Sequence, residues 1–189
     1  MIYYRLFSKI YDFASKKTCR QCSDFVKRGS KILDLGCGSG ITGKAFREFF
    51  GAEVTGTDIS DVRAVSLPFK KMDGKNIPFE DNSFDIVFIN HVLHHSENTD
   101  ILLNEAKRVT RERIIVYENL PEGFIQKLIC KLHGITFAKL FQKNNKNGDF
   151  KTTEQWRRIF KNLGLNLIFE KEVLLFPKSK LFVLQKTGA

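Results

Sequence analysis

Glycines and one carboxylate alternate in the stretch that begins at Lys31. Asp34 is followed by Gly36, Gly38 and Gly40, after a short apolar run that predicts a buried strand. Glycine tolerates positive φ and lets a ligand approach the backbone closely. The amphipathic segment after Gly40 predicts a helix whose first N–H groups are free to bind that ligand. The pattern therefore predicts a nucleotide-type ligand at a strand–turn–helix junction.

Two kinds of nucleotide ligand fit this turn. The spacing Gly38-x-Gly40-x-x-Gly43 satisfies the dinucleotide fingerprint, and Asp58 follows about 20 residues later, where a ribose-binding acid is expected. Asp34 argues against a dinucleotide, because a carboxylate in the turn repels a pyrophosphate. It suits a ligand with an ammonium and a sulfonium group. An NAD-linked oxidoreductase is kept as a minor alternative.

The turn resembles the first motif of the class I S-adenosylmethionine-dependent methyltransferases, an acid followed by alternating glycines. A more specific resemblance runs from Ile77 to Val87: Ile-Pro-Phe, an acidic turn, then Ser-Phe-Asp-x-Val, a pattern without a counterpart in dehydrogenases. The stretch from Thr152 to Leu165 resembles the last helix and sixth strand of small-molecule methyltransferases. The resemblance covers nearly the whole chain and is weakest at 1–28 and 119–150.

The resemblance implies S-adenosylmethionine as the cofactor. The contacts that it implies are Tyr11, Asp34, Gly36, Cys37, Gly38, Asp58, Ile59, Asp73, Gly74 and Asn90. Asp58 would accept the ribose hydroxyls, Asp73 the adenine amino group, and the backbone N–H after it would reach a ring nitrogen. Asn90 would lie under the methionine part. Tyr11 would cover the cofactor, although packing on the core explains this tyrosine equally well.

The predicted fold is a single α/β domain over residues 1–189, a length that suits one core. We expect a Rossmann-like three-layer sandwich whose seven-stranded sheet is mostly parallel, and the family resemblance implies an antiparallel last strand. Residues 1–28 are expected to form an N-terminal helical cap, and 119–150 a variable helical region over the substrate. Because Asp61 to Pro68 is short for a parallel crossover, we predict a reduced helix there.

Candidate catalytic residues follow two predicted strands. His91 and His94 come after the strand Phe84 to Asn90, and Glu118 after the strand Arg113 to Tyr117. Ligands bind at the carboxyl ends of strands in open α/β sheets. Methyl transfer from a sulfonium chiefly needs alignment of the nucleophile, and a general base matters only for a hydroxyl or carbon acid. The alternatives are histidines that merely line the pocket and a solvated loop acid at Glu118.

The crowding of His91, His94 and His95 also raises the question of a metal ion. No matching carboxylate cluster stands at ligand spacing, so we predict no metal site. Cys19-x-x-Cys22 has metal or redox spacing, but no second pair follows and the pattern places it inside a helix. We expect two ordinary reduced thiols there.

The methyl acceptor is predicted to be a small molecule, through an oxygen, nitrogen or carbon atom. The net charge of +10 admits nucleic acid, but the lysines are spread along the chain. The run from Asn90 to Leu93 also lacks the Asn-Pro-Pro-aromatic pattern of enzymes that methylate the exocyclic amines of bases. An RNA methyltransferase and a cofactor-binding protein without transferase activity are the alternatives.

Residues 121–142 combine an apolar face with interspersed lysines. Such a basic amphipathic helix suits contact with a membrane surface or with a hydrophobic substrate. Packing of this helix on the sheet is the alternative. No apolar run reaches the ~20 residues of a membrane span, and the first residues lack the regions of a signal peptide. The predicted location is therefore the cytoplasm, and the sequence leaves the oligomeric state open.

Overall fold

The computed structural model describes residues 8–141, 148–173 and 178–186. Its strands are β1 (Lys31–Leu35), β2 (Glu53–Asp58), β3 (Phe69–Lys71), β4 (Phe84–Asn90), β5 (Thr110–Asn119), β6 (Leu165–Val173) and β7 (Ser179–Lys186). Its helices are α2 (Ser8–Gln21), α3 (Ile41–Phe50), α4 (Thr99–Val109), α5 (Phe124–Phe141) and α6 (Thr153–Asn162). Two short 3-10 helices, η1 (Ser23–Phe25) and η2 (Leu93–His95), lie between them.

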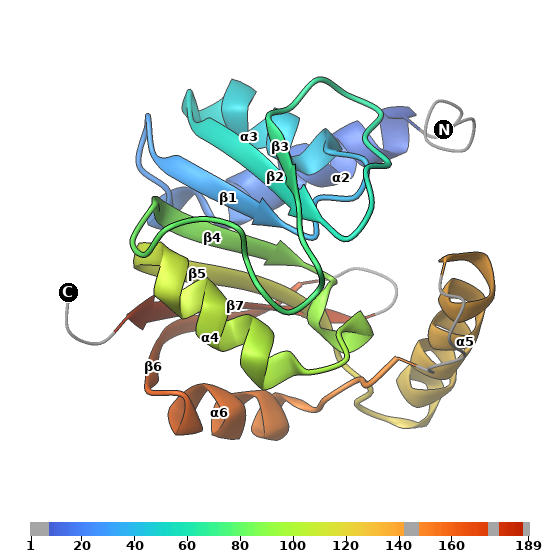
Figure 1. Ribbon diagram of the computed structural model, residues 1–189. Coiled ribbons are helices and arrows are strands. Elements are labelled where there is room, and N and C mark those ends of the chain that lie inside the picture. The colour runs from blue at the N-terminus through green and yellow to red at the C-terminus, as the bar shows by residue number, and fades with distance from the viewer. Residues whose placement is uncertain (1–7, 142–147, 174–177, 187–189) are drawn as a thin grey trace.

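The strands form one seven-stranded sheet in the order β3-β2-β1-β4-β5-β7-β6 (Figure 1). The pairs from β3 to β5 are parallel, whereas β7 is antiparallel to both β5 and β6. The predicted Rossmann-like α/β fold with an antiparallel last strand is therefore confirmed. Among the described residues, no helix is long and apolar enough to cross a membrane.

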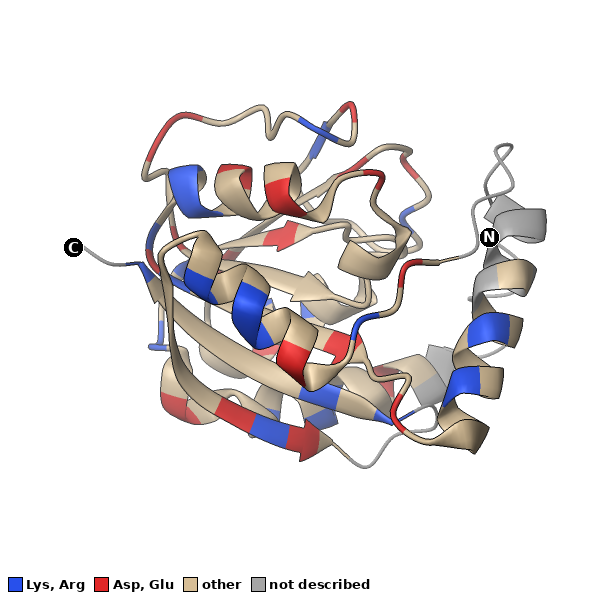
Figure 2. Cartoon of the chain, turned by 90° about the horizontal axis from the view of Figure 1, so that it is seen from below, with Lys and Arg blue, Asp and Glu red and all other residues tan. Residues whose placement is uncertain are grey.

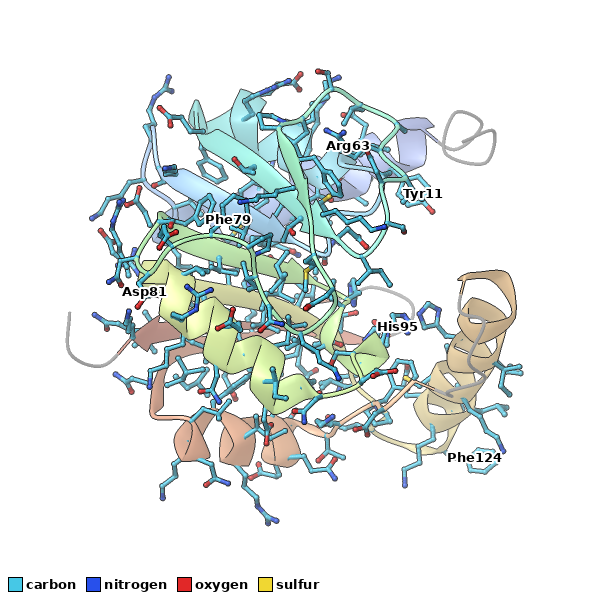
Figure 3. All side chains as sticks on the ribbon, in the orientation of Figure 1. Tyr11, Arg63, Phe79, Asp81, His95 and Phe124 are labelled. Atoms are coloured by element: carbon cyan, nitrogen blue, oxygen red, sulfur yellow. The ribbon has the colours of Figure 1, made fainter. Side chains whose placement is uncertain are left out.

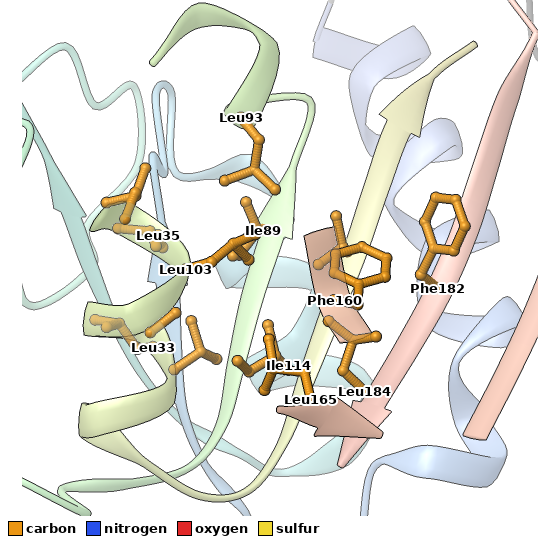
Figure 4. Packing of buried hydrophobic residues seen from close by; sticks show 14 of the residues in the cluster. Leu33, Leu35, Ile89, Leu93, Leu103, Ile114, Phe160, Leu165, Phe182 and Leu184 are labelled. Atoms are coloured by element: carbon orange, nitrogen blue, oxygen red, sulfur yellow. The ribbon is translucent and has the colours of Figure 1, made fainter. Parts of the chain in front are cut away.

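Side-chain alternation along the strands builds a separate apolar cluster on each face of the sheet. On β4, Val87 and Ile89 pack with α4 and α6, whereas Ile86 and Phe88 pack with α2 and α3. Figure 4 shows part of the first cluster. On β5, the same alternation places Val116 with α4 and α6, and Tyr117 with α2 and α3. This alternation decides which face each site residue occupies.

The connection from β2 to β3 differs from the prediction. Residues 59–68 form no helix at all, so the predicted reduced helix is wrong. The segment instead folds as a loop against the glycine turn, where Ala64 N donates to Ser39 O at 2.8 Å. Arg63 holds the loop together, since it pairs with Asp61 at 2.7 Å and donates to Leu67 O. These local bonds replace the helical hydrogen bonds that so short a crossover cannot form.

The helix starts follow local capping rules. Asn98 caps α4 by accepting a hydrogen bond from Ile101 N at 3.0 Å. The spacing Thr152-x-x-Gln155 predicts a capping box, and these two residues form it at the start of α6. Cys19 and Cys22 lie buried beside α3 as free thiols, and Cys22 Sγ donates to Thr18 O at 3.0 Å. The predicted polar loop at 143–148, except its last residue, and the predicted turn at Pro177 lie outside the described residues.

Candidate cofactor site and active site

The turn after β1 is shaped by its glycines. Gly36 has φ +73°, and a Cβ there would overlap Val92, whose Cγ1 would lie only 2.8 Å away. Gly38 has φ +49°, and no atom lies within 4 Å of its Cβ position, so space is open above it. The turn is tied to β2 because Gly36 N and Cys37 N both donate to Thr57 O, at 2.8 and 3.1 Å. A ligand can therefore approach the backbone closely at Gly38, whereas Val92 packs against Gly36.

Asp34 lies on β1 beneath this turn and is 3% exposed. Its Oδ2 has no hydrogen-bond partner and lies 2.9 Å from the position of a Cβ on Gly43, at the start of α3. Burial, and after it the nearby Asp58, raises the pKa of Asp34 to about 7. A cation that entered the turn would favour the charged form of this carboxyl. The attraction between Asp34 and a cationic ligand stays a prediction.

Asp58, Ile59 and Gly74 stand near the carboxyl ends of β2 and β3. Asp58 Oδ2 accepts a hydrogen bond from Gly38 N at 2.9 Å, which ties the end of β2 to the glycine turn. The exposed Ile59 follows, and its Cγ2 lies 3.3 Å from the position of a Cβ on Gly74. These two residues form an apolar surface against which a planar ring could stack.

Asp73 is the predicted cofactor residue that is most engaged elsewhere. Its Oδ1 accepts hydrogen bonds from Asn76 N at 2.6 Å and Lys75 N at 2.7 Å, and its Oδ2 accepts one from Asn76 Nδ2 at 2.6 Å. These bonds, first those from Asn76, lower the pKa of Asp73 to about 2. An adenine amino group would have to share these oxygen atoms with the turn.

A cavity of about 190 Å³ lies between α2 and the ends of β4 and β5. It is lined by Tyr11, Ala14, Ser15, Lys17, Thr18, Gln21, Thr42, Asn90, His91 and Tyr117. Tyr117 OH donates to Gln21 Oε1 at 3.3 Å, and the hydroxyls of Ser15 and Thr42 lie 3.2 Å apart. Figure 3 labels Tyr11 on α2. The structure therefore brings Tyr11, Asn90 and His91 to one cavity.

Sequence reasoning missed most of the polar residues that line this cavity. Ser15, Thr18 and Gln21 follow Tyr11 at helical spacing, so they share one face of α2. This spacing of polar residues along one helix face is the sequence pattern that indicates the cavity lining. Tyr117 was read only as the end of a strand. Its side chain faces the cavity because β5 alternates as described above.

His91 has unusual backbone geometry for a histidine. Within the described residues, only His91 and Asn82 combine a side chain with positive φ, which is +57° at His91. Its backbone N–H donates to Tyr117 O at 2.8 Å, and its Nδ1 is buried without a hydrogen-bond partner. Burial lowers the pKa of His91 to about 4, and the Glu118 carboxylate offsets only part of this effect. The ring is thus neutral near pH 7 and can accept a proton.

His94 and Glu118 form a buried pair that is not part of the cavity lining. His94 Nδ1 lies 2.5 Å from Glu118 Oε2, and Leu93 N donates to Glu118 Oε1 at 2.7 Å. Burial alone raises the pKa of Glu118, but the His94 imidazole and the Leu93 N–H outweigh it, so the net pKa is lowered. Phe150 stacks on His94 with ring centroids 4.4 Å apart.

Glu118 is not the solvated loop acid that the sequence left open. β5 continues past the predicted strand because β7 pairs with it, Glu118 opposite Lys180 and Asn119 opposite Ser179. Glu118 is therefore fully buried within the strand. Alternation places it on the face opposite Tyr117, towards η2.

Comparisons with known proteins decide between the cofactors. A family model described as a methyltransferase domain matches residues 33–116. A demethylmenaquinone methyltransferase from Staphylococcus haemolyticus is 31% identical over 76% of this chain and 71% of that protein. The chain belongs to the class I S-adenosylmethionine-dependent methyltransferases. S-adenosylmethionine is its cofactor, and the NAD-linked alternative is wrong.

Two further proteins show how far this likeness extends. A sarcosine/dimethylglycine N-methyltransferase from Aphanothece halophytica is 27% identical over 66% of this chain, which spans only 53% of that protein. A solved S-adenosylmethionine-dependent methyltransferase from Methanosarcina mazei aligns with a TM-score of 0.69 at 16% identity, over 87% of this chain and 95% of its own. The solved structure confirms the fold alone.

The residues of this methyltransferase fit the cofactor in charge and shape. S-adenosylmethionine supplies a methyl group on a positively charged sulfur. The glycine turn and the strand ends beside it offer the unpartnered Oδ2 of Asp34 and the carboxylate of Asp58, while Ile59 and Gly74 provide the apolar surface. The individual contacts stay predictions, and the acceptor is the open question.

Proposed function

We propose that this methyltransferase acts on a small hydrophobic molecule that it takes up at a membrane surface. The observation that carries the proposal is the outer face of α5. Four of its apolar side chains are exposed, Phe124 by 85%, Ile125 by 68%, Leu128 by 51% and Leu132 by 55%. Figure 3 shows Phe124 at the outer end of α5. Exposed apolar groups of this size mark a surface that meets an apolar partner.

The charge of α5 fits an anionic lipid surface. Lys127 and Lys131 stand among the apolar residues, and α5 contains no acidic residue. Each basic residue near an anionic leaflet adds about 1 kcal/mol of attraction. Figure 2 shows both signs of charge on the other elements, with basic residues spread over several of them. Such a spread favours lipid contact through α5 over one continuous RNA-binding face.

The position of α5 supports the uptake of an apolar acceptor. The ring of His133 on α5 lies 5.6 Å from that of His94, whose ring lies 6.5 Å from that of His91 in the cavity lining. An acceptor that leaves the lipid along α5 would thus arrive beside the cavity. The relative named for demethylmenaquinone acts on an apolar acceptor, which agrees with this proposal.

The residues of the chain would then align the acceptor and take up its proton. The α2 face and Tyr117 would hold the acceptor and exclude water, which supplies most of the catalytic advantage of a displacement. S-adenosylmethionine, when bound, would supply the methyl group and would keep the electron pair of the carbon–sulfur bond on its sulfur, which loses its positive charge. A hydroxyl or carbon acid must also lose a proton, and Nδ1 of the neutral His91 would accept it.

The test combines methyl transfer with vesicle binding. Tritiated S-adenosylmethionine is offered with three acceptors: a prenylated hydroquinone in anionic vesicles, a secondary amine in water, and transfer RNA. We expect label in the hydroquinone. The double variant Phe124→Ser/Leu128→Ser should lose at least about tenfold in vesicle affinity. A tenfold loss corresponds to about 1.4 kcal/mol, and burying two large apolar side chains in lipid contributes more than that. Cofactor binding should stay unchanged.

Ile101→Ser is the matched control, because Ile101 is an exposed apolar residue on α4 rather than on α5. It should bind vesicles like the natural chain. Label in RNA with a steep salt dependence would replace our proposal by the RNA alternative. Label in the amine alone would refute uptake of the acceptor from a membrane. Cofactor binding without any methyl transfer would favour the non-catalytic alternative. A cytoplasmic location stays a prediction.

A further inference from the structure

All histidines of the chain gather in one place. The sequence has four, and the rings of His94, His95 and His133 lie within 5.6 Å of each other, centroid to centroid. His91 is next to His94, at 6.5 Å. One ring nitrogen from each of His94, His95 and His133 lies within 4.8 Å of the other two. Figure 3 shows His95 between η2 and α5.

His94 has the hydrogen bonding that is typical of a metal ligand. Its Nδ1 contacts the Glu118 carboxylate at 2.5 Å, which leaves Nε2 as the nitrogen available for coordination. Metal-binding histidines almost always bond to a carboxylate or carbonyl through their other nitrogen, which fixes the tautomer. His94 Nε2 is buried and has no hydrogen-bond partner. A buried polar atom without a partner is costly, and a metal ion would satisfy this one.

Simple packing does not explain the same set of contacts. Phe150 stacks on one side of His94, as in an ordinary core. A histidine that serves only for packing would still be expected to bond through Nε2 once it is buried. His95, on the same 3-10 helix, and His133, on α5, instead each place a ring nitrogen within 4.8 Å of a ring nitrogen of His94.

We propose that His94, His95 and His133 bind one divalent transition-metal ion of the zinc type, with Glu118 as the residue that positions His94. Imidazole nitrogens prefer such ions. Three histidines with a fourth position open to water are a common arrangement for zinc. Bonds of about 2.0–2.1 Å require the nitrogens to draw somewhat closer than they are now. The ion would therefore fasten α5 to η2.

The sequence alone predicts no metal because no matching carboxylate cluster stands at ligand spacing near His91 to His95. The third ligand comes from α5, far along the chain, and no local spacing announces it. Cys130, one turn before His133, lies outside the set of mutually close ligand atoms. The proposal is independent of which acceptor the enzyme methylates.

The test uses the full chain, purified without a polyhistidine tag and stripped with a chelator. Zn²⁺ is titrated in competition with a chromophoric chelator, and Co²⁺ is added separately to record its visible d–d bands. We expect one ion per chain and the intense bands of four-coordinate Co²⁺. His133→Ala should lose about 100-fold in Zn²⁺ affinity, and Glu118→Gln about 10–100-fold.

Lys131→Ala is the matched control, because Lys131 lies on the same helix as His133, is exposed, and is not one of the proposed metal ligands. It should bind Zn²⁺ as the natural chain does and give the same Co²⁺ bands. The proposal is overturned if the natural chain binds no Zn²⁺ stoichiometrically. It is also overturned if His133→Ala binds Zn²⁺ as tightly as Lys131→Ala. Zn²⁺ affinity and the Co²⁺ bands are both measured without methyl transfer, so their outcome is independent of the proposed acceptor.

Discussion

The charge of Asp34 makes a prediction that separates electrostatics from packing. The carboxyl is 3% exposed, and its pKa is raised from 3.8 to about 7, first by burial and then by Asp58. Each unit of pKa corresponds to about 1.36 kcal/mol. The shift of roughly three units is thus worth up to about 4 kcal/mol. That energy opposes folding of the cofactor-free protein when Asp34 is ionised.

The sign of the pH dependence follows from which state holds the proton. Below pH 3.8 both the folded and the unfolded chain carry a protonated Asp34. Between pH 3.8 and about 7 the unfolded chain has lost this proton while the folded chain keeps it, so stability falls as pH rises. Above pH 7 both states are ionised and the full loss remains. Asp34→Asn removes this dependence.

The assay is thermal and urea unfolding of the cofactor-free natural chain and Asp34→Asn, from pH 4 to pH 8. The asparagine amide does not titrate, so it adds a cost that is independent of pH, about 1–3 kcal/mol for a buried donor without a partner. The difference between the two proteins at pH 4 measures that cost. The stability difference should then grow towards pH 8 in favour of Asp34→Asn, and this increase measures the cost of burying the ionised carboxylate. At about 2–4 °C per kcal/mol, a charge cost of up to about 4 kcal/mol gives an expected relative gain of up to about 15 °C in the melting temperature.

Cofactor binding completes this test. A cationic ligand favours the ionised carboxyl, so the natural chain should release up to one proton on binding S-adenosylmethionine near pH 6. Calorimetry in buffers of different ionisation enthalpy measures this release. Asp34→Asn should release no such proton and bind the cofactor more weakly. A stability difference that stays flat from pH 4 to pH 8, together with unchanged cofactor affinity, would refute the electrostatic reading of Asp34.

Two further predictions concern the glycine turn and the cavity. Gly36→Ala should cost more stability than Gly51→Ala by at least about 1–3 kcal/mol in urea unfolding. Both glycines have positive φ, but a Cβ on Gly36 would overlap Val92, whereas a Cβ on Gly51 would make only an ordinary contact with Arg28, at 3.8 Å. Equal costs would contradict this. His91→Asn, which tolerates the positive φ, should lower kcat about 10²–10⁴-fold for a hydroxyl or carbon acceptor. The natural rate should be flat above about pH 5, since the pKa of His91 is about 4; an unchanged kcat in the variant would exclude His91 as the base.

Local patterns carried the parts of the structure that were predicted well. The glycine turn, the strand Phe84 to Asn90 and the capping box at Thr152 depend on residues a few positions apart. Their backbone geometry is therefore determined by residue patterns over a short stretch of sequence. The antiparallel last strand was implied by the family resemblance, and the pairing of β7 with β5 and β6 confirms it.

The errors and omissions arise where distant segments meet. β5 was predicted too short because its last residues are held by β7, which follows much later in the chain. That extension converts Glu118 from a presumed rim residue into a buried partner of His94. The approach of His133 to the same place depends on how α5 folds back, and no periodicity within 121–142 encodes it.

Consecutive residues of β5 connect the two chemical centres while keeping their side chains apart. Tyr117 faces the cavity, and its carbonyl oxygen accepts the backbone N–H of His91. Glu118 faces the other side and accepts the backbone N–H of Leu93, at the start of η2. The backbone from His91 to His95 is therefore fixed from both faces of one strand. A metal ion at η2 would accordingly influence methyl transfer by changing how His91 is held, and its removal should alter kcat while leaving cofactor affinity intact.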